Sequence, residues 1–186
     1  MYGREVEGAV FEKIKLTEAL MPVSADNFKL GMRHLAGAVC VVTTQHGGKK
    51  RGLTVTAICS LSVDPPSVLV CVNRLASAHD AIARSRCLAV NLLSTKHLER
   101  AQIFSGMRGI EGDIRFAEED WFILQTGAPA LRSAVGIFDC QVVEAVPTKT
   151  HTVFVAVVVD AQFDNSQEPL LYLRGKYSKA VALPES

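Results

Sequence analysis

The segment from Gly52 to Asn73 constrains the fold of this chain more than any other stretch. Two strand-like runs flank the pair Pro65 and Pro66, which ends the first run because proline cannot donate a hydrogen bond to a sheet. A strand that only fills a core prefers large apolar residues, yet the first run carries small hydroxyl residues (Thr54, Thr56, Ser60 and Ser62). Each hydroxyl is both a donor and an acceptor, and small side chains allow a close approach to the backbone. We interpret this run as one wall of a ligand site.

Composition argues against several classes of protein. The chain has 186 residues, enough for one domain with a complete core, and 48% of them are hydrophobic. Its net charge of +1 gives no support for nucleic acid as a partner, since phosphate contacts need an excess of Lys and Arg. The longest apolar run, Val153 to Val159, is strand-sized, so we expect no membrane-spanning segment. Charged residues interrupt the N-terminal region, so we expect no secretory signal either.

The cysteines indicate a reducing compartment. The chain has 5 of them, at Cys40, Cys59, Cys71, Cys87 and Cys140. An odd number without a Cys-x-x-Cys pair argues against a disulfide framework and against a structural zinc site. We interpret them as buried thiols that behave as small hydrophobic residues, and we expect a cytoplasmic protein.

The N-terminal part is predicted to be helical. Apolar residues recur at near-helical spacing among charged ones through residues 1–20, and Pro22 ends this first helix. Ser24 is expected to cap a second helix, which Gly37 closes. We therefore divide the chain into an N-terminal helical extension, residues 1–25, and one domain, residues 26–186.

The remainder is predicted to be mainly β, with helices inserted at two places. The expected strands are residues 38–44, 53–62, 67–73, 88–93, 121–124, 135–146, 152–162, 170–173 and 176–183. Ser77 and Thr95 are expected to cap the two inserted helices, and residues 105–120 to form an exposed excursion. Strands joined mostly by hairpins indicate an antiparallel barrel with peripheral helices. Alternating βαβ units and a Gly-x-Gly-x-x-Gly motif are both missing, which disfavours a Rossmann sheet.

Short motifs spread along this domain resemble those of the flavin reductase family, which includes the reductase components of two-component flavin-dependent monooxygenases. The matching elements are Phe28, residues 37–44, Gly52-Leu53-Thr54, Ser60-Leu61-Ser62, Pro65-Pro66, residues 73–77, Asn91-Leu92-Leu93 and Phe104-Ser105-Gly106. Each is weak alone, but their order and spacing are fairly specific, and together they cover residues 26 to 182. The resemblance implies an FMN-binding split barrel that works as a homodimer, with a flavin near the subunit interface.

The implied activity is that of an NAD(P)H-dependent flavin reductase. Hydride passes from NADH or NADPH to FMN or FAD, and the reduced flavin supplies a partner monooxygenase. Two alternatives stay open. One is a flavoprotein that reduces a non-flavin acceptor such as a cobalt corrinoid, and the other is a flavin-binding module without turnover. The residues do not choose between the two flavins or between the two nucleotides.

The resemblance also implies a set of cofactor-binding residues. The backbone of Thr54, Val55, Thr56 and Ala57 would read the edge of the flavin ring, and Ser60 would bond the ribityl chain or the ring edge. The neighbouring strand would contribute Cys71, Val72 and Asn73, and the family serine that meets the flavin phosphate corresponds to Ser77, with Arg74 adding charge. Tyr177 belongs to a closing hairpin near the pocket. Asn91 is either a structural amide in a buried strand or a flavin-side contact.

His151 is the candidate catalytic residue. It begins a predicted strand after a turn, at a position similar to that of a family histidine near the flavin and the nicotinamide. A protonatable group there can stabilise charge on the flavin or orient the nicotinamide amide. The other four histidines (His34, His46, His79 and His97) carry no recognisable ligand spacing, and we interpret them as surface or capping residues.

Overall fold

A computed structural model describes residues 21–117 and 120–183. The chain forms two compact units, Met1–Leu35 and Ala36–Ser186. The helix predicted for residues 1–20 lies outside the described residues. No helix among those that are described is long and apolar enough to cross a membrane.

The helix predicted after Ser24 is present but shorter than expected. Helix α1 spans Ala25–Met32, and the Ser24 side chain caps it by accepting a hydrogen bond from the Asn27 N–H at 3.3 Å. The prediction that Gly37 closes this helix is wrong, because the helix ends at Met32 and Gly37 belongs to strand β1 (Gly37–Ala38). Gly37 is needed there for another reason. A Cβ atom at this position would lie 3.0 Å from the Cβ of Thr56.

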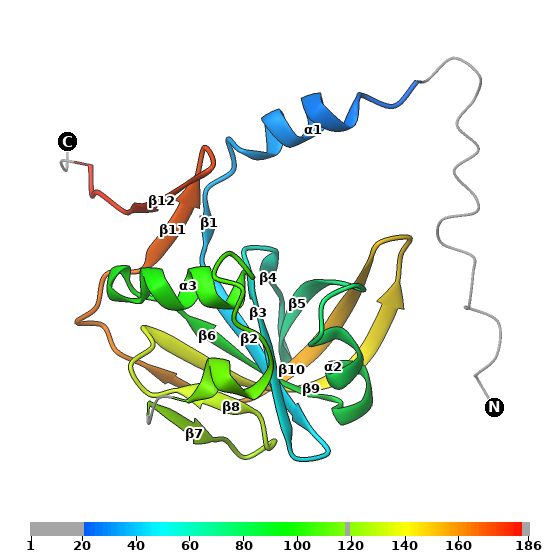
Figure 1. The fold of residues 1–186 in the computed structure, drawn as a ribbon, viewed down its shortest axis with the longest axis vertical. Coiled ribbons are helices and arrows are strands. Elements are labelled where there is room, and N and C mark those ends of the chain that lie inside the picture. Colours follow the sequence, from blue (N-terminus) through cyan, green and yellow to red (C-terminus); the bar gives the residue numbers. More distant parts are fainter. Residues whose placement is uncertain (1–20, 118–119, 184–186) are drawn as a thin grey trace. The chain divides into compact units, whose positions relative to one another are not determined.

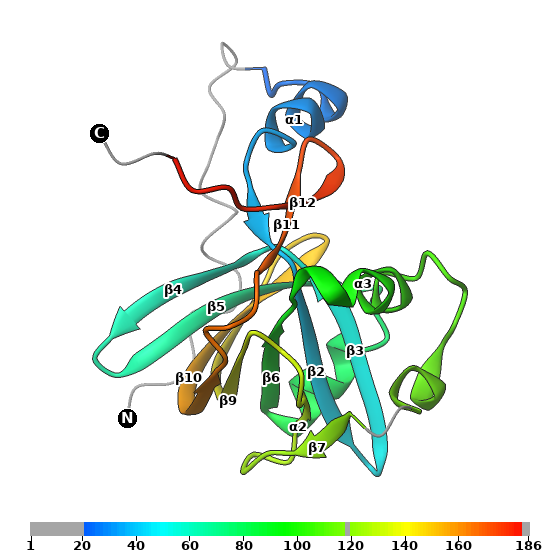
Figure 2. The same ribbon diagram turned by 90° about the vertical axis from the view of Figure 1, so that its left-hand side faces the viewer.

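The second unit is mainly β, and all its strand pairings are antiparallel, as predicted. A 7-stranded sheet has the order β3-β2-β6-β9-β10-β5-β4. Its strands are β2 (Cys40–His46), β3 (Lys49–Val55), β4 (Ile58–Val63), β5 (Pro66–Asn73), β6 (Cys87–Leu92), β9 (Gly136–Pro147) and β10 (His151–Phe163). Figure 1 shows the sheet with its flanking helices, and in Figure 2 the β4–β5 hairpin splays away from β2 and β3.

Two smaller sheets and four short helical elements make up the rest of this unit where the structure describes it. Strand β1 pairs with β11 (Leu170–Leu173), which pairs with β12 (Lys176–Lys179), and β7 (Trp121–Ile123) pairs with β8 (Pro129–Leu131). The helices are α2 (His79–Ser85) and α3 (Leu98–Phe104), with the 3-10 turns η1 (Thr95–His97) and η2 (Gly112–Phe116). Strand β8 was missed because it begins with Pro129, a residue that argues against a strand.

Both predicted caps of the inserted helices are displaced by one residue. The N-cap of α2 is Ala78 and not Ser77. The N-cap of η1 is Ser94 and not Thr95, because the Ser94 N–H donates to Nδ1 of His97 at 3.1 Å and closes a capping box. Side chains of several residue types can satisfy a helix start, so local sequence alone does not choose between neighbouring hydroxyl residues.

The large sheet is covered on both faces, which gives two hydrophobic cores. Alternate residues of β2 point to opposite sides, with Val41 in one core and Val42 in the other. Helix α3 covers the first core through Phe104, and α2 covers the second through Ile82. Gly52 of β3 allows α3 to approach, because a Cβ there would lie 2.8 Å from Cε1 of Phe104.

Candidate active site

Thr56 and Ala57 form the short connection between the two edge strands of the 7-stranded sheet. The sequence predicted one strand from Leu53 to Ser62, and this is wrong, because β3 ends at Val55 and β4 begins at Ile58. Strands β3 and β4 are the two edge strands of the 7-stranded sheet. The three Cα–Cα steps from Val55 to Ile58 span at most about 11 Å, so the two edges must approach each other here. The sheet is therefore curled into a barrel that is joined at this dipeptide, which we call the joint.

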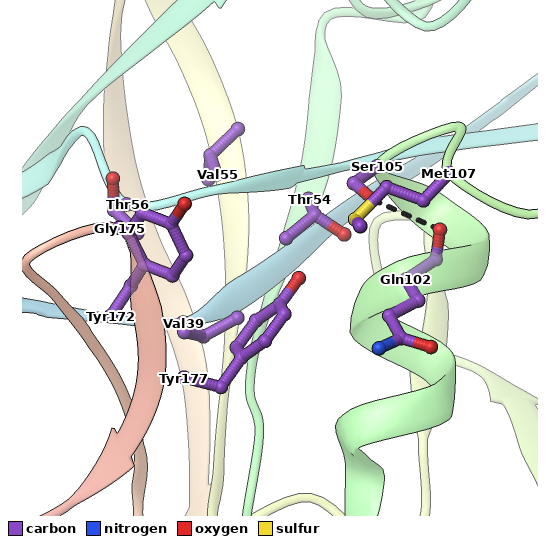
Figure 3. A pocket seen from close by; sticks show the side chains of 10 residues that line it. All are labelled: Val39, Thr54, Val55, Thr56, Gln102, Ser105, Met107, Tyr172, Gly175 and Tyr177. Atoms are coloured by element: carbon purple, nitrogen blue, oxygen red, sulfur yellow. Dashed lines mark hydrogen bonds between the residues drawn. The ribbon is translucent and has the colours of Figure 1, made fainter.

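A pocket of about 370 Å³ lies on one side of the joint. Figure 3 shows the residues around it, which come from β3, from the joint, from α3 with the loop after it, from the β11–β12 hairpin, and from Val39 between β1 and β2. Four predicted cofactor-binding residues meet in this pocket, namely Thr54, Val55, Thr56 and Tyr177. The other polar residues of its lining were not among the predicted site residues, and these are Gln102, Ser105 and Tyr172. The one available signal was the Phe104-Ser105-Gly106 motif in the loop after α3.

Hydrogen bonds and ring contacts fix the walls of this first pocket. The Thr54 hydroxyl donates to the carbonyl oxygen of Ala101 in α3 at 2.8 Å. Tyr172 and Tyr177 are direct cross-strand partners, and their rings make an edge-to-face contact with centroids 5.3 Å apart. Burial raises the pKa of the Tyr177 phenol, while a hydrogen bond with Ser105 lowers it to a smaller extent. Tyr177 is therefore a neutral hydroxyl at ordinary pH.

A second pocket, of about 620 Å³, lies beside the joint and shares Thr56 with the first. Its lining is mostly apolar, and it includes Phe138 and Leu92 from the central strands of the sheet. The polar part of its lining comes from the joint, β4 and β5, and it includes the predicted residue Ser60. The hydroxyl-rich run thus contributes to both pockets, which agrees with its interpretation as the wall of a ligand site.

Strand register brings further predicted residues together on the outer face of the sheet. The Cys71 N–H donates to the Ala57 carbonyl at 3.0 Å, so β5 continues the contact with the joint beyond β4. Asn73, at the end of β5, is directly opposite His151, at the start of β10. Cys71 and Asn73 occupy alternate positions and share this outer face. Val72 points the other way and is fully buried, so only its backbone is available to a ligand.

The loop after β5 differs from the predicted capping arrangement. Ser77 does not cap α2, and its exposed hydroxyl has no hydrogen-bond partner among the residues that the structure describes. The loop is held instead by Asn73, whose Oδ1 accepts from the Leu75 N–H at 2.9 Å. Arg74 donates through its backbone N–H to the Thr150 carbonyl at 3.0 Å and through its guanidinium to the Thr148 carbonyl at 3.4 Å. This anchors the loop on the β9–β10 turn beside His151.

His151 is exposed, and its ring nitrogen Nδ1 lies 2.9 Å from Oγ1 of Thr150. The turn before it is closed by the Thr148 hydroxyl, which donates to the His151 carbonyl at 2.8 Å. Strand β5 lies between His151 and β4, so the histidine is about 10 Å from the joint, the width of two strand spacings. It is on the outer face with Asn73, at the edge of the candidate site.

His79 follows the Ser77 loop, and from the sequence it was interpreted as a surface or capping residue. Its side chain is largely buried and makes two polar contacts, from Nε2 to Oγ1 of Thr152 at 2.8 Å and from Nδ1 to Oδ1 of Asp80 at 2.9 Å. The hydrogen bond from His79 lowers the pKa of the exposed Asp80 carboxyl. The ring also packs against Phe154 with centroids 5.7 Å apart. His79 therefore fastens the start of α2, and the Ser77 loop before it, to β10.

Asn91 is completely buried in β6, and its amide makes three hydrogen bonds within the protein. Its Nδ2 donates to the Val41 carbonyl at 2.9 Å and to Oγ1 of Thr43 at 3.1 Å, and its Oδ1 accepts from the Leu131 N–H at 2.7 Å. It lines neither of the two pockets. Of the two interpretations that the sequence left open, the structural amide accounts for these contacts.

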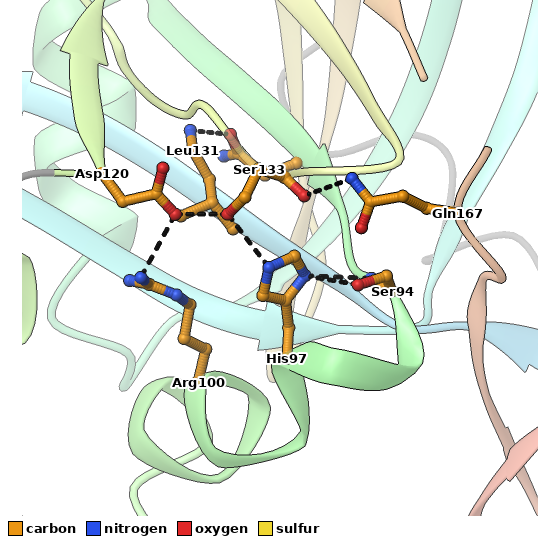
Figure 4. A network of polar contacts seen from close by, with 8 residues as sticks. Ser94, His97, Arg100, Asp120, Leu131, Ser133 and Gln167 are labelled. Carbon is orange, nitrogen blue, oxygen red and sulfur yellow. Dashed lines mark hydrogen bonds and ion pairs between the residues drawn. The ribbon is translucent and has the colours of Figure 1, made fainter. Parts of the chain in front are cut away.

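A second polar network lies near α3 and explains another histidine (Figure 4). His97 was interpreted as a surface or capping residue, and it is a capping residue that is buried. Its Nε2 lies 3.0 Å from Oγ of Ser133, and that hydroxyl donates to the Asp120 carboxylate. Asp120 also forms an ion pair with Arg100 at 3.3 Å. The network ties α3, which contributes Gln102 to the first pocket, to the β7–β8 segment.

Within residues 21–117 and 120–183, no group of three or more His, Cys, Asp or Glu side chains is arranged to hold a metal ion. All 5 cysteines are free, and their burial is only partly as predicted. Cys40, Cys87 and Cys140 are buried, whereas Cys71 is half-buried and Cys59 is exposed.

Comparison with known proteins gives one consistent result. Residues 32–180 match the model of the family described as "Flavin reductase like domain". The chain is 40% identical over 164 residues to FMN reductase (NADH) RutF 2 of Methylorubrum extorquens strain PA1, covering 88% of this chain and 94% of the relative.

Solved structures agree with this match. NADH:FAD oxidoreductase SgcE6 of Streptomyces globisporus C-1027, in complex with NAD and FAD fragments, superposes with a TM-score of 0.78 at 25% identity, over 89% of this chain and 98% of that one. Nitrilotriacetate monooxygenase component B of Mycobacterium thermoresistibile gives a TM-score of 0.78 at 26% identity, over 87% and 90% of the two chains.

Proposed function

Because the chain belongs to the flavin reductase like domain family, we propose that it is an NADH-dependent flavin reductase. The names of the relative from Methylorubrum extorquens and of the Streptomyces globisporus protein support this assignment. The former is named as an FMN reductase that uses NADH, so we propose FMN as the flavin and NADH as the reductant here. The bound flavin supplies the ring that accepts hydride from the nicotinamide.

The observation that carries this proposal is the joint at Thr56 and Ala57, which borders both pockets. A reaction between two planar rings requires a site where both are held in contact. Two pockets of about 370 and 620 Å³ with a common wall are of a suitable size for such ligands. Thr56 and Ala57 belong to neither strand, and although the Ala57 carbonyl accepts from the Cys71 N–H, the other backbone groups of the joint are available to a ring edge in a way that those of a continuous strand are not.

The residues around the joint fit a flavin by their chemistry. We assign the ring edge to the backbone of Thr54 to Ala57 with Tyr177 beside it, and the ribityl chain to Ser60. The outer face would add Cys71, Asn73 and the backbone of Val72. The phosphate would lie at the Ser77 loop, where an unpartnered hydroxyl and the positive charge of Arg74 are available. Asn91 would not contact the flavin, and it would contribute indirectly by holding together strands that support the site.

We assign the remaining predicted role, that of the catalytic group, to His151. It is exposed on the outer face beside Asn73, within about two strand spacings of the joint. Its ring can hold a proton near a flavin or turn a nicotinamide amide by hydrogen bonding. Replacing it with Gln keeps one donor and one acceptor but removes the charge, so a catalytic role that needs the charge predicts a lower kcat with an intact KM.

The direct test is anaerobic mixing of the purified protein with NADH and FMN. We expect the nicotinamide absorbance and the flavin absorbance to fall together, and NADPH and FAD serve as the competing nucleotide and flavin. If neither band changes in any of the four combinations, the proposed activity is wrong. Flavin binding without nucleotide oxidation would instead indicate a binding module, and retention of flavin with electron transfer to a corrinoid would indicate the other alternative.

We propose further that the protein works as a homodimer. Large apolar side chains are exposed on three strands of the main sheet, at Leu61 and Val63 of β4, Val143 of β9 and Val159 of β10, with exposed fractions from 43% to 87%. Such exposure is typical of a surface that a second copy covers. Light scattering should give twice the chain mass of 20.1 kDa. The change Val63→Glu should lower that mass, and a monomeric wild-type protein would contradict the proposal.

The physiological partner follows from the same family. One matched structure is named as a monooxygenase component, so we propose that a flavin-dependent monooxygenase consumes the reduced flavin. The 5 free thiols support a reducing, cytoplasmic location. Co-purification with an oxygenase, or loss of oxygenase turnover when the reductase is withheld, would test the partnership.

A further inference from the structure

The first pocket contains an amide whose orientation is fixed by chemistry. Gln102 lies in α3, and its Oε1 accepts a hydrogen bond from Nε of Arg108 at 3.0 Å. An arginine can only donate, so the amide atom at this distance must be the oxygen, and the nitrogen must occupy the other position. Figure 3 shows that nitrogen on the side of Tyr177, with the oxygen turned away. Among the described residues, no hydrogen bond uses this nitrogen, so Gln102 presents a donor.

A matching acceptor comes from the adjacent strand. The proton of the Thr54 hydroxyl is committed to the carbonyl of Ala101, the residue before Gln102. Only the lone pairs of that oxygen remain, so toward the pocket Thr54 can only accept. The link through Ala101 also fixes the strand against the helix at this point. A fixed donor and a fixed acceptor therefore stand on neighbouring elements of one pocket.

The rest of the pocket favours a flat group. The cross-strand pair Tyr172 and Tyr177 forms one wall, and Val39 and Val55 contribute apolar surface. Ser105 donates to the Gln102 carbonyl at 2.9 Å, which holds the backbone of the helix end where Gln102 stands. A planar ligand edge with a carbonyl next to an N–H would meet the Gln102 donor and the Thr54 acceptor at once.

We infer that Gln102 and Thr54 together bind the amide edge of a ligand through hydrogen bonds to its carbonyl and its N–H. Arg108 positions Gln102 for this contact. This inference rests on the proposed function, since both reactants carry such an edge. The flavin has a carbonyl and an N–H on its pyrimidine ring, and the nicotinamide has a carboxamide. Gln102 donates to the carbonyl, and Thr54 accepts from the N–H.

The experiment measures equilibrium binding of FMN and of NADH separately, by flavin fluorescence and by nucleotide fluorescence. The variant Gln102→Leu removes the donor at similar size and should weaken one of the two ligands about tenfold, because a hydrogen bond to a ligand carbonyl is lost. Arg108→Met should weaken the same ligand by a smaller factor, since the amide is then free to turn. The control is Glu99→Gln, an exposed position on the same helix, which should change neither affinity.

Ligand analogues test the acceptor. For the flavin these are FMN and N3-methyl FMN, and for the nucleotide NADH and its acetylpyridine analogue, which keeps the carbonyl but lacks the amide N–H. For the ligand whose amide edge is bound by Gln102 and Thr54, the analogue should bind the wild-type protein about tenfold more weakly than the parent ligand. The analogue should lose no further affinity in the Thr54→Val variant. The Thr54→Ser variant should again bind the parent ligand more tightly than the analogue. Thermal melting of each variant separates a loss of binding from a loss of folding.

The outcomes are distinct. A loss of affinity confined to FMN identifies the pyrimidine edge of the flavin as the group that Gln102 and Thr54 bind. A loss of affinity confined to NADH identifies the nicotinamide carboxamide. If Gln102→Leu and Arg108→Met bind both ligands within twofold of Glu99→Gln, the inference is overturned while the proposed function stands. If the wild-type protein binds neither ligand, both are overturned.

Discussion

Asn91 provides a sharp test, because its two interpretations predict opposite results. The change Asn91→Ala removes the hydrogen bonds to the Val41 carbonyl, the Thr43 hydroxyl and the Leu131 N–H. Each bond contributes a net of about 1 kcal/mol, and leaving the Leu131 N–H buried without a partner costs about 1–3 kcal/mol more. The free energy of unfolding should therefore fall by about 4–6 kcal/mol. For a chain of this size that corresponds to a fall in melting temperature of about 10–20 °C.

The assay is thermal and urea unfolding of the flavin-free protein, followed by FMN binding well below the melting temperature. A structural amide predicts a large loss of stability with an almost unchanged affinity for flavin. The double variant with Thr43→Val should show a coupling of about 1 kcal/mol, because the two side chains share a hydrogen bond. The exposed change Asn165→Ala is the control. A stable Asn91→Ala protein that binds flavin poorly would refute the reasoning.

Three further predictions concern packing, thiols and the phosphate loop. Gly52→Ala should lower the free energy of unfolding by about 1–3 kcal/mol, because the new Cβ lies 2.8 Å from the Phe104 ring and 3.0 Å from the Val42 carbonyl, whereas Gly31→Ala in open space should not. Burial raises the pKa of the Cys40 and Cys140 thiols from 9.0 to about 12, so at pH 8 a thiol reagent should modify Cys59 long before these two, and equal rates would contradict this. These thiols ionise at a lower pH in the unfolded protein than in the folded protein. The contribution of the pKa shifts to the free energy of unfolding is therefore complete below about pH 9 and is lost between about pH 9 and 12. Urea titrations at several pH values measure this change. Ser77→Ala should weaken FMN about tenfold and leave riboflavin unaffected, and an equal effect on both ligands would exclude a phosphate contact.

The strands were predictable because their signals are local. The Gly47-Gly48 turn, the Pro65-Pro66 corner and the paired runs of β9 and β10 place β-forming residues next to turn residues. The split barrel and the flavin chemistry came from the resemblance, which the matched family model supports. Sequence periodicity by itself reached only an antiparallel barrel.

The joint, by contrast, could not be predicted. Every residue from Leu53 to Ser62 is compatible with one strand, and only the pairing of β3 with β2 and of β4 with β5 breaks the run between them. The contacts of His79 were missed for a related reason. They depend on Thr152, which lies 73 positions away in the sequence. Contacts between residues that are far apart in the sequence are not indicated by any periodic pattern of residues.

The short joint also limits how this protein can change. Because side chains alternate along a strand, one extra residue between Val55 and Ile58 would turn every side chain of β4 to the opposite face. A two-residue insertion would keep the faces but allow the two sheet edges to drift apart by several ångströms. Loops elsewhere on the barrel tolerate growth far better, so variation in length among related chains should avoid this dipeptide and gather at the β2–β3 and β9–β10 turns.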